Sequence, residues 1–236
     1  MTMLKTNENG RSMIEMLGVL AIIGVLSVGG IAGYSKAMNK FKTNKVADNV
    51  SMIVANVKTL YAQQKNYGTP GDQGTALKTS KAIDLGIIPD ELIKTEGEEG
   101  SQTKVLRNAY NGTVFVGATQ SVNGDADLRA FYLTFNGLSK EACVALATND
   151  WGSGSSSGLI AMQVKSVSTA TDTDAKLLTL TSAANMKMGC AGSNTSSTYI
   201  VCPGGTTAAV PMKVSEAAKA CACDSGNTCS ITWKYY

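Results

Sequence analysis

The sequence predicts an α+β protein, in which a long N-terminal helix packs through its second half on a C-terminal antiparallel β-sheet domain. An unbroken apolar stretch fills residues 13–32, and an amphipathic helical pattern follows it directly. Beyond residue 66, short apolar stretches alternate with turn residues. The 236 residues therefore suffice for one globular domain beside the helix. We expect three parts: residues 1–10, a helix over residues 11–66 with its membrane segment at 11–33, and a globular domain over residues 67–236.

The apolar stretch is long enough to cross a bilayer. Its roughly 20 residues measure about 30 Å as a helix, which is the thickness of a hydrocarbon core. Glu15 lies near its start, where a charge costs about 2.5 to 3.5 kcal/mol on insertion scales. We therefore expect this carboxylate to have a function and a partner.

The amphipathic pattern predicts that the same helix continues to residue 64. Apolar residues recur three and four positions apart between residues 41 and 61, mostly separated by lysine, aspartate and asparagine. Asn66, Gly68 and Pro70 then end the helix. Its second half thus has one apolar face, which can pack on the globular domain.

The rest of the chain predicts short elements. We expect a short helix or turn over residues 81–88, an exposed acidic loop over 97–100, strands over 113–118 and 128–135 joined by a turn at 123–125, a helix over 139–147 with Ser139 as its N-cap, a flexible loop over 152–158, a loop or edge strand over 166–174, a helix over 215–220 and a final strand over 230–236.

Composition disfavours catalysis and nucleic-acid binding. The chain has no histidine, which is the commonest general base and metal ligand. Its formal net charge is only +3 and aromatic residues make up 6%, so neither a basic patch nor a set of stacking rings is indicated. We expect a protein that is not an enzyme, with no cofactor, no metal and no direct contact with nucleic acid.

The six cysteines all follow the apolar stretch, which favours disulfides in an oxidising compartment such as a bacterial periplasm or the cell surface. The lysines over residues 36–45 favour a cytoplasmic location for this side of the membrane segment, but we give the cysteines more weight. Zinc is the rival interpretation. Cys221 and Cys223 are separated by a single residue, which is too tight for the usual zinc-binding pair, and we favour disulfides.

The string GRSMIEML at residues 10–17, followed by a long apolar helix, resembles the prepilin signal of type IV pilins and pseudopilins. The resemblance implies that residues 1–10 are a leader, cleaved between Gly10 and Arg11 by a membrane prepilin peptidase, and that the new amine of Arg11 is methylated. It also implies that Glu15 sets the register of subunits in a filament. The family usually has an apolar residue at the position of Arg11, so the guanidinium could supplement the amine as the partner of Glu15.

Three further strings resemble the type IVb subgroup, particularly the pilins of plasmid-encoded thin pili. They are NGTV at residues 111–114, FYLTFN at 131–136 and KEAC at 140–143. Six cysteines allow 15 pairings, and the sequence alone does not choose among them. By this resemblance Cys143 pairs with one of Cys221, Cys223 or Cys229. The expected pairs are Cys143 with Cys221 (or with Cys223), Cys190 with Cys202, and Cys223 with Cys229.

The resemblance implies a structural subunit of a type IV pilus. Such a subunit is a single-pass inner-membrane protein before cleavage and part of an extracellular helical filament afterwards. Its implied partners are further copies of the chain, the prepilin peptidase and the inner-membrane pilus assembly machinery. A type II secretion pseudopilin is the first alternative, and a membrane-anchored periplasmic binding protein is the second.

Overall fold

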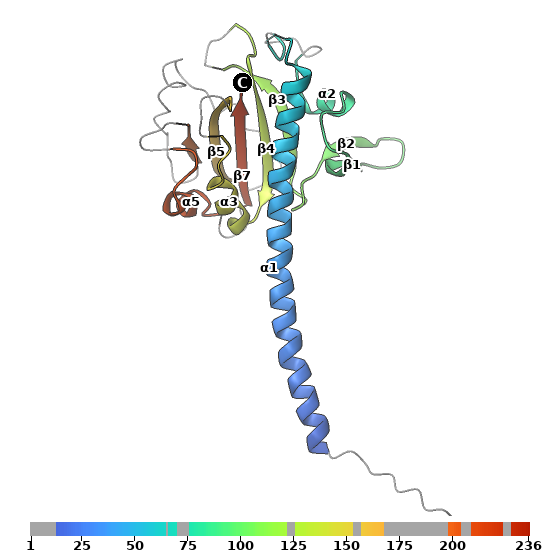
Figure 1. Cartoon of the computed structure of the whole chain (residues 1–236). Helices are drawn as coiled ribbons and strands as arrows, with labels where there is room; N and C mark the ends of the chain where they lie inside the picture. The colour runs from blue at the N-terminus through green and yellow to red at the C-terminus, as the bar shows by residue number, and fades with distance from the viewer. Residues whose placement is uncertain are drawn as a thin grey trace, which may run out of the picture. The chain divides into compact units, whose positions relative to one another are not determined.

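The computed structural model describes residues 13–64, 66–69, 76–121, 126–152, 157–167, 198–203, 209–223 and 228–236. The chain divides into two units, Met1–Phe41 and Lys42–Tyr236. We call the second unit the head. Helix α1 (Met13–Leu60) contributes its first part to the first unit and its second part to the head (Figure 1).

Helix α1 confirms the predicted long N-terminal helix. It ends at Leu60 rather than at residue 64, and a last turn follows in which the N–H of Gln64 donates to the carbonyl of Tyr61 at 2.9 Å. The chain turns here because Tyr61 packs on Tyr67, with 5.1 Å between the ring centroids.

In the first unit, α1 exposes large apolar side chains on every side. Ile14, Leu20 and Val25 are 80%, 63% and 75% exposed. The hydroxyl of Ser27 donates to the carbonyl of Ile23 at 2.7 Å, which satisfies this polar group within the helix. A helix that is apolar all round is suited to lipid or to a protein core, and α1 is long and apolar enough to cross a membrane.

The head is built on a five-stranded antiparallel sheet with the order β3-β4-β7-β5-β6, which confirms the predicted sheet. The strands are β3 (Val114–Thr119), β4 (Ala130–Leu138), β5 (Leu159–Val167), β6 (Thr198–Val201) and β7 (Thr228–Tyr235). The predicted hairpin is the β3–β4 pair, in which Val114 lies opposite Phe135, and its turn at 123–125 lies outside the described residues. The final strand of the chain lies between β4 and β5, at the centre of the sheet (Figure 1).

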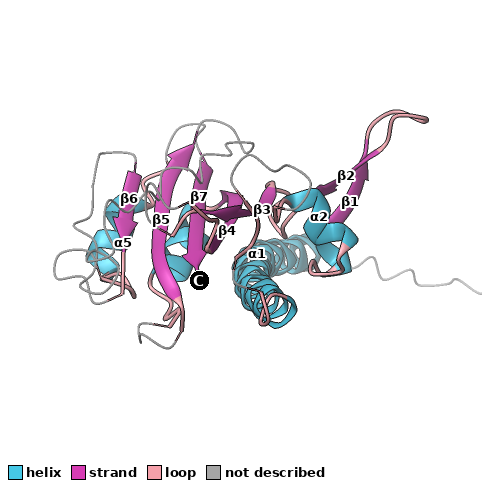
Figure 2. Cartoon of the chain, turned by 90° about the horizontal axis from the view of Figure 1, so that it is seen from above, coloured by secondary structure: helices cyan, strands magenta, loops and turns pink. Residues whose placement is uncertain are grey.

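The second part of α1 packs on one face of this sheet (Figure 2). Its buried residues recur at the predicted helical spacing, and Val50 and Ile53 are fully buried. They share one hydrophobic core with Phe131 of β4 and Trp233 of β7. Burial of one face of α1 therefore joins the helix to the sheet, as the amphipathic pattern predicted.

Smaller elements flank α1 on both sides (Figures 1 and 2). On one side lie α2 (Thr79–Asp84), the 3-10 helix η1 (Asp90–Leu92), and the hairpin of β1 (Ile93–Glu96) and β2 (Thr103–Leu106). On the other side lie α3 (Lys140–Ala147) and α5 (Val214–Ala220). Ser139 caps α3 as predicted, and its hydroxyl accepts the N–H of Ala142 at 3.2 Å.

The stability of the head should fall steeply above pH 10 because of a buried run of tyrosine rings. Tyr67 packs between Tyr61 and Phe131, and burial together with a smaller repulsion from Tyr61 raises the pKa of Tyr67 to about 12. Below pH 10 both states keep the phenol protonated. Between pH 10 and about 12 the unfolded chain ionises while folded Tyr67 does not, so stability is lost as pH rises.

Melting temperatures recorded across this interval by tryptophan fluorescence check the prediction. Tyr67→Phe keeps the ring contacts and removes the titrating group, so its melting temperature should fall less between pH 9 and about 11. An equal fall in both proteins would contradict the role given to Tyr67.

Candidate functional site

Glu15 lies in the first turn of α1, among exposed apolar side chains. A carboxylate at this end of a helix is favoured by the helix dipole. Among the described residues, no cation lies within ion-pair distance of it. Gly10 and Arg11, the predicted cleavage site, lie outside the described residues. The structure therefore places the carboxylate where a positive group from outside the described chain can reach it.

Two disulfides tie the C-terminal part of the head together. Cys143 of α3 is bonded to Cys221, which follows α5, with 5.8 Å between their Cα atoms and a sequence separation of 78. Cys223 is bonded to Cys229 of β7, with a separation of 6. These are two of the pairs that the sequence and the resemblance led us to expect.

The third expected pair lies partly outside the described residues. Cys202 is buried at the end of β6, and Cys190 is not among the described residues.

The sulfurs of Cys143, Cys221 and Cys229 lie within 4.8 Å of one another, which is a spacing that a soft metal could bridge. Because these sulfurs are in disulfides, they are not the thiolates that zinc requires.

The structure explains why asparagine and glycine occur in the NGTV string at residues 111–114. Asn111 has a φ of 62°, and a side chain at Gly112 would overlap the carbonyl oxygen of Asn136 in β4. Asn108 organises this loop: its Oδ1 accepts the N–H groups of Tyr110 and Gly112 at 2.8 and 3.1 Å, and its Nδ2 donates to the carbonyl of Asn136 at 2.8 Å. The motif therefore holds the start of β3 against β4.

Sequence reasoning overlooked Asn108 and Asn136 as members of one network. Asn136 lies at an irregularity in the pairing of β4 with β7, and its Oδ1 accepts the hydroxyl of Ser230 at 2.5 Å. Both asparagines are buried, and most buried side-chain amides in proteins are hydrogen-bonded, as these two are. A polar residue inside the FYLTFN string was the available signal.

The head also holds the second part of α1 through polar contacts at its edges. The hydroxyls of Thr43 and Tyr110 are hydrogen-bonded at 2.8 Å, and Lys45 pairs with Glu91 at 2.8 Å. The Lys45 pair is well exposed, and such pairs contribute about 0 to 1 kcal/mol, so the apolar face of α1 supplies most of the attachment.

An ion pair links the two ends of the β1–β2 hairpin, because Glu96 lies beside its turn and Arg107 follows the last residue of β2. Arg107 donates two hydrogen bonds to Glu96, at 2.7 and 2.8 Å, and these hydrogen bonds hold the pKa of Glu96 below its usual value. The residues between the strands, predicted as an exposed acidic loop, form the turn of this hairpin. The hairpin exposes most of its side chains and projects from the head (Figure 2).

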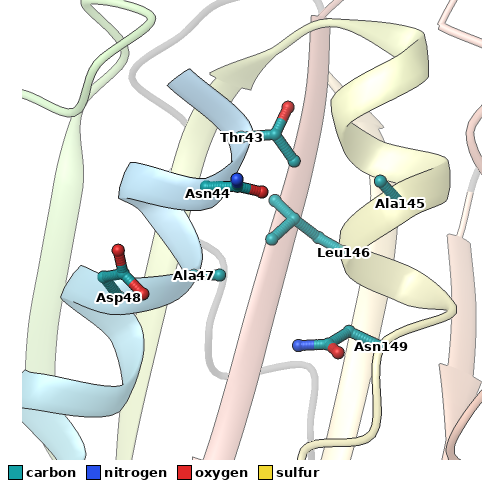
Figure 3. Close-up of a pocket in the computed structure, with 7 residues that line it drawn as sticks. All are labelled: Thr43, Asn44, Ala47, Asp48, Ala145, Leu146 and Asn149. Carbon is teal, nitrogen blue, oxygen red and sulfur yellow. The ribbon is translucent and has the colours of Figure 1, made fainter. Parts of the chain in front are cut away.

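A pocket of about 370 Å³ lies between α1 and α3 (Figure 3). It is lined by Thr43, Asn44, Ala47, Asp48, Ala145, Leu146 and Asn149. Leu146 reaches from α3 towards α1. The lining offers one carboxylate, two amides and a hydroxyl, without a thiol, an imidazole or a second carboxylate to complete a pair of acid and base groups.

Comparison with known proteins agrees with this geometry. The PilS family model, described as PilS N terminal, matches residues 40–202. The major structural subunit of bundle-forming pilus of Escherichia coli O127:H6 is 27% identical over 148 residues, which is 63% of this chain and 68% of that protein. The toxin coregulated pilin of Vibrio cholerae serotype O1 is 25% identical over 145 residues, which is 61% of this chain and 59% of that protein.

Solved structures that resemble this chain include two pilins. One is the type IV b pilin from Salmonella typhi, with a TM-score of 0.46 and 15% identity over 80% of this chain and 95% of that one. The other is TcpA, a type IV pilin from Vibrio cholerae El Tor biotype, with a TM-score of 0.45 and 16% identity over 83% of this chain and 99% of that one. On the family match, which covers well over half of its residues, this chain belongs to the PilS family.

Proposed function

We propose that this chain is the structural subunit of a type IV pilus, and that its N-terminal helix first anchors it in the inner membrane and then forms part of the filament core. The observation that carries the proposal is the difference in exposure between the two parts of α1. Its first part exposes apolar side chains on all sides around a single carboxylate, whereas one face of its second part is buried in the disulfide-bonded head. Lipid and neighbouring subunits are the two environments that suit the first part.

In this proposal a prepilin peptidase cleaves between Gly10 and Arg11. The new amine, methylated or not, and the guanidinium of Arg11 then provide positive charge for the Glu15 of a neighbouring copy. In a medium of low dielectric such a pair enforces register, because a subunit one step out of place would leave a buried charge without a partner. A contact between different surfaces of identical subunits that does not close into a ring builds a fibre.

The same proposal assigns the chain no reaction of its own. The relatives are named as pilus subunits, and this supports a filament rather than a secretion pseudopilus or a binding protein. The pocket between α1 and α3 lacks paired acid and base groups, which is in keeping with this assignment.

Mass spectrometry of the mature N-terminus tests the processing. We expect the mature chain to begin at Arg11, with or without one methyl group on its amine. If chains recovered from filaments still carried residues 1–10, the proposed cleavage would be contradicted.

Glu15→Ala should abolish filaments while leaving the head folded. Removing one partner of a buried ion pair costs about 3 to 5 kcal/mol, which is enough to prevent stable addition of a subunit. Electron microscopy of the cell surface measures filament number. Ser27→Ala is the matched control, because this hydroxyl is already satisfied within its own helix and its loss should leave filaments unchanged. Normal filaments from Glu15→Ala would contradict the register role.

A further inference from the structure

Three sulfur atoms from two different disulfides lie together in the core of the head. The Sγ atoms of Cys143, Cys221 and Cys229 lie within 4.8 Å of one another, and all three residues are fully buried. Cys143 and Cys221 are bonded to each other, whereas Cys229 is bonded to Cys223. The sulfur of Cys229 also lies 3.7 Å from the carbonyl oxygen of Cys221. A sulfur that close to a second disulfide can exchange partners with it.

The backbone itself keeps Cys143 and Cys229 close. Cys229 lies opposite Leu138 in the pairing of β7 with β4. Ser139 follows Leu138, and the N–H of Cys143 donates to the carbonyl of Ser139 at 2.9 Å. Cys143 therefore lies one helical turn beyond Ser139, which directly follows the residue that pairs with Cys229. Their proximity depends on sheet register and on the start of α3.

Cys221 reaches the cluster by a different route. It is the residue that ends α5, and it meets Cys143 because α5 lies beside α3. Loss of the Cys221 sulfur would therefore leave the other two sulfurs near each other. The cluster holds two possible partners for Cys143, and they come from independent parts of the fold.

We propose that these three sulfurs form an intramolecular thiol–disulfide exchange site, in which Cys229 is the alternative partner of Cys143. When Cys143 is a free thiolate, it attacks the Sγ of Cys229. The Cys143–Cys229 bond forms, the Cys223–Cys229 bond breaks, and Cys223 leaves as a thiolate that takes up the proton lost by Cys143. The exchange needs no oxidant and no reductant.

The difference in exposure between Cys223 and Cys229 sets the direction of this exchange. Cys223 is half-buried, whereas Cys229 is fully buried. Water therefore stabilises the leaving thiolate of Cys223 better than it would stabilise one at Cys229. Attack at Cys229 is favoured for the same reason, because it expels the better solvated sulfur.

The site makes the link between α3 and the end of the chain redundant. Whichever partner Cys143 takes, the bond joins α3 to the C-terminal residues and closes a long loop. A chain in which Cys143–Cys229 forms first therefore already has α3 bonded to its C-terminal part. When Cys221 then attacks this bond, Cys143–Cys221 forms and Cys229 leaves as a thiolate that takes up the proton lost by Cys221. A second disulfide, supplied by an external disulfide oxidant that is itself reduced to two thiols, then joins Cys229 to Cys223. The exchange site therefore lets oxidative folding reach the observed pairing from either order of bond formation.

Disulfide mapping of Cys221→Ser tests the proposal. The full chain, with Cys190 and Cys202 also replaced by serine, is purified in detergent, alkylated under denaturing conditions at acid pH and mapped by mass spectrometry. We expect a Cys143–Cys229 disulfide and alkylation of Cys223 in most molecules. The matched control is the chain with Cys190 and Cys202 replaced alone, which should show Cys143–Cys221 and Cys223–Cys229. A folded Cys221→Ser variant that keeps Cys223–Cys229 and is alkylated at Cys143 would overturn the proposal.

Cys223→Ser supplies a second test that does not remove the long loop. It leaves a thiol at Cys229 beside the intact Cys143–Cys221 bond. We expect part of the molecules to carry Cys143–Cys229 with alkylation at Cys221, and this species should form faster at about pH 9 than at about pH 6, because the thiolate is the attacking form. Alkylation at Cys229 alone throughout this range would show that the sulfurs do not exchange.

Discussion

Replacing Cys143 by alanine should lower the free energy of unfolding of the head by roughly 4 to 5 kcal/mol. The Cys143–Cys221 bond closes a loop with a sequence separation of 78, and in the chain-entropy model a loop of this size restricts the unfolded chain by about that amount. Exchange cannot compensate, because every remaining pairing in the cluster is local. Typical domains are stable by only about 5 to 15 kcal/mol, so the variant should unfold under mild conditions.

Urea titration of the full chain in detergent, followed by tryptophan fluorescence, measures this loss. Both tryptophans report on the head, since Trp151 and Trp233 pack against each other in its core with 4.9 Å between ring centroids. Cys223→Ala is the matched control: its bond has a sequence separation of only 6, and its loss should cost about 2 kcal/mol. Equal losses in the two variants would contradict the importance of the long loop.

Ile53→Asp should detach the second part of α1 from the sheet. Ile53 is fully buried in the core shared with β4 and β7, so a carboxylate there would either lie unpaired in an apolar site or force the helix away. We expect a loss of more than about 3 kcal/mol, with the head losing its cooperative unfolding transition.

Met52→Asp provides the matched comparison for this change. Met52 is the preceding residue of the same helix and is 49% exposed, so both variants carry the same helix propensity penalty and differ in burial. Its unfolding free energy should change by only about 0.5 kcal/mol. Similar losses from the two variants, measured by the same titration, would mean that the face of α1 assigned to the core is wrong.

The fold class was accessible from the sequence because its main signals are local. The period of apolar residues in α1, the alternation in the β3–β4 hairpin and Ser139 at the start of α3 each depend on neighbouring residues. Strand β5 was not predicted: most of its residues are buried, so it lacks the alternation that identifies a strand with one solvated face. The β1–β2 hairpin was missed because most of its side chains are exposed, so its strands do not alternate between apolar and polar residues.

The candidate site likewise has one feature with a local sequence signal and one without. Glu15 was found by its hydropathy context, since a carboxylate in an apolar stretch needs no structural knowledge to be noticed. The partner of Cys143 could not be derived from spacing. The structure gives the physical reason, because the sulfurs of Cys221 and Cys229 are both within reach of Cys143.

The central position of β7 determines when the head can fold. Strands β4 and β5 are both paired with β7, and β7 is made of the last residues of the chain. Until β7 has paired, β4 and β5 each have an unpaired edge, and such edges promote aggregation. A subunit shortened by a few residues at its C-terminus would leave its sheet divided in two. An ordered head therefore forms only after residues 228–235 have been made and inserted between β4 and β5.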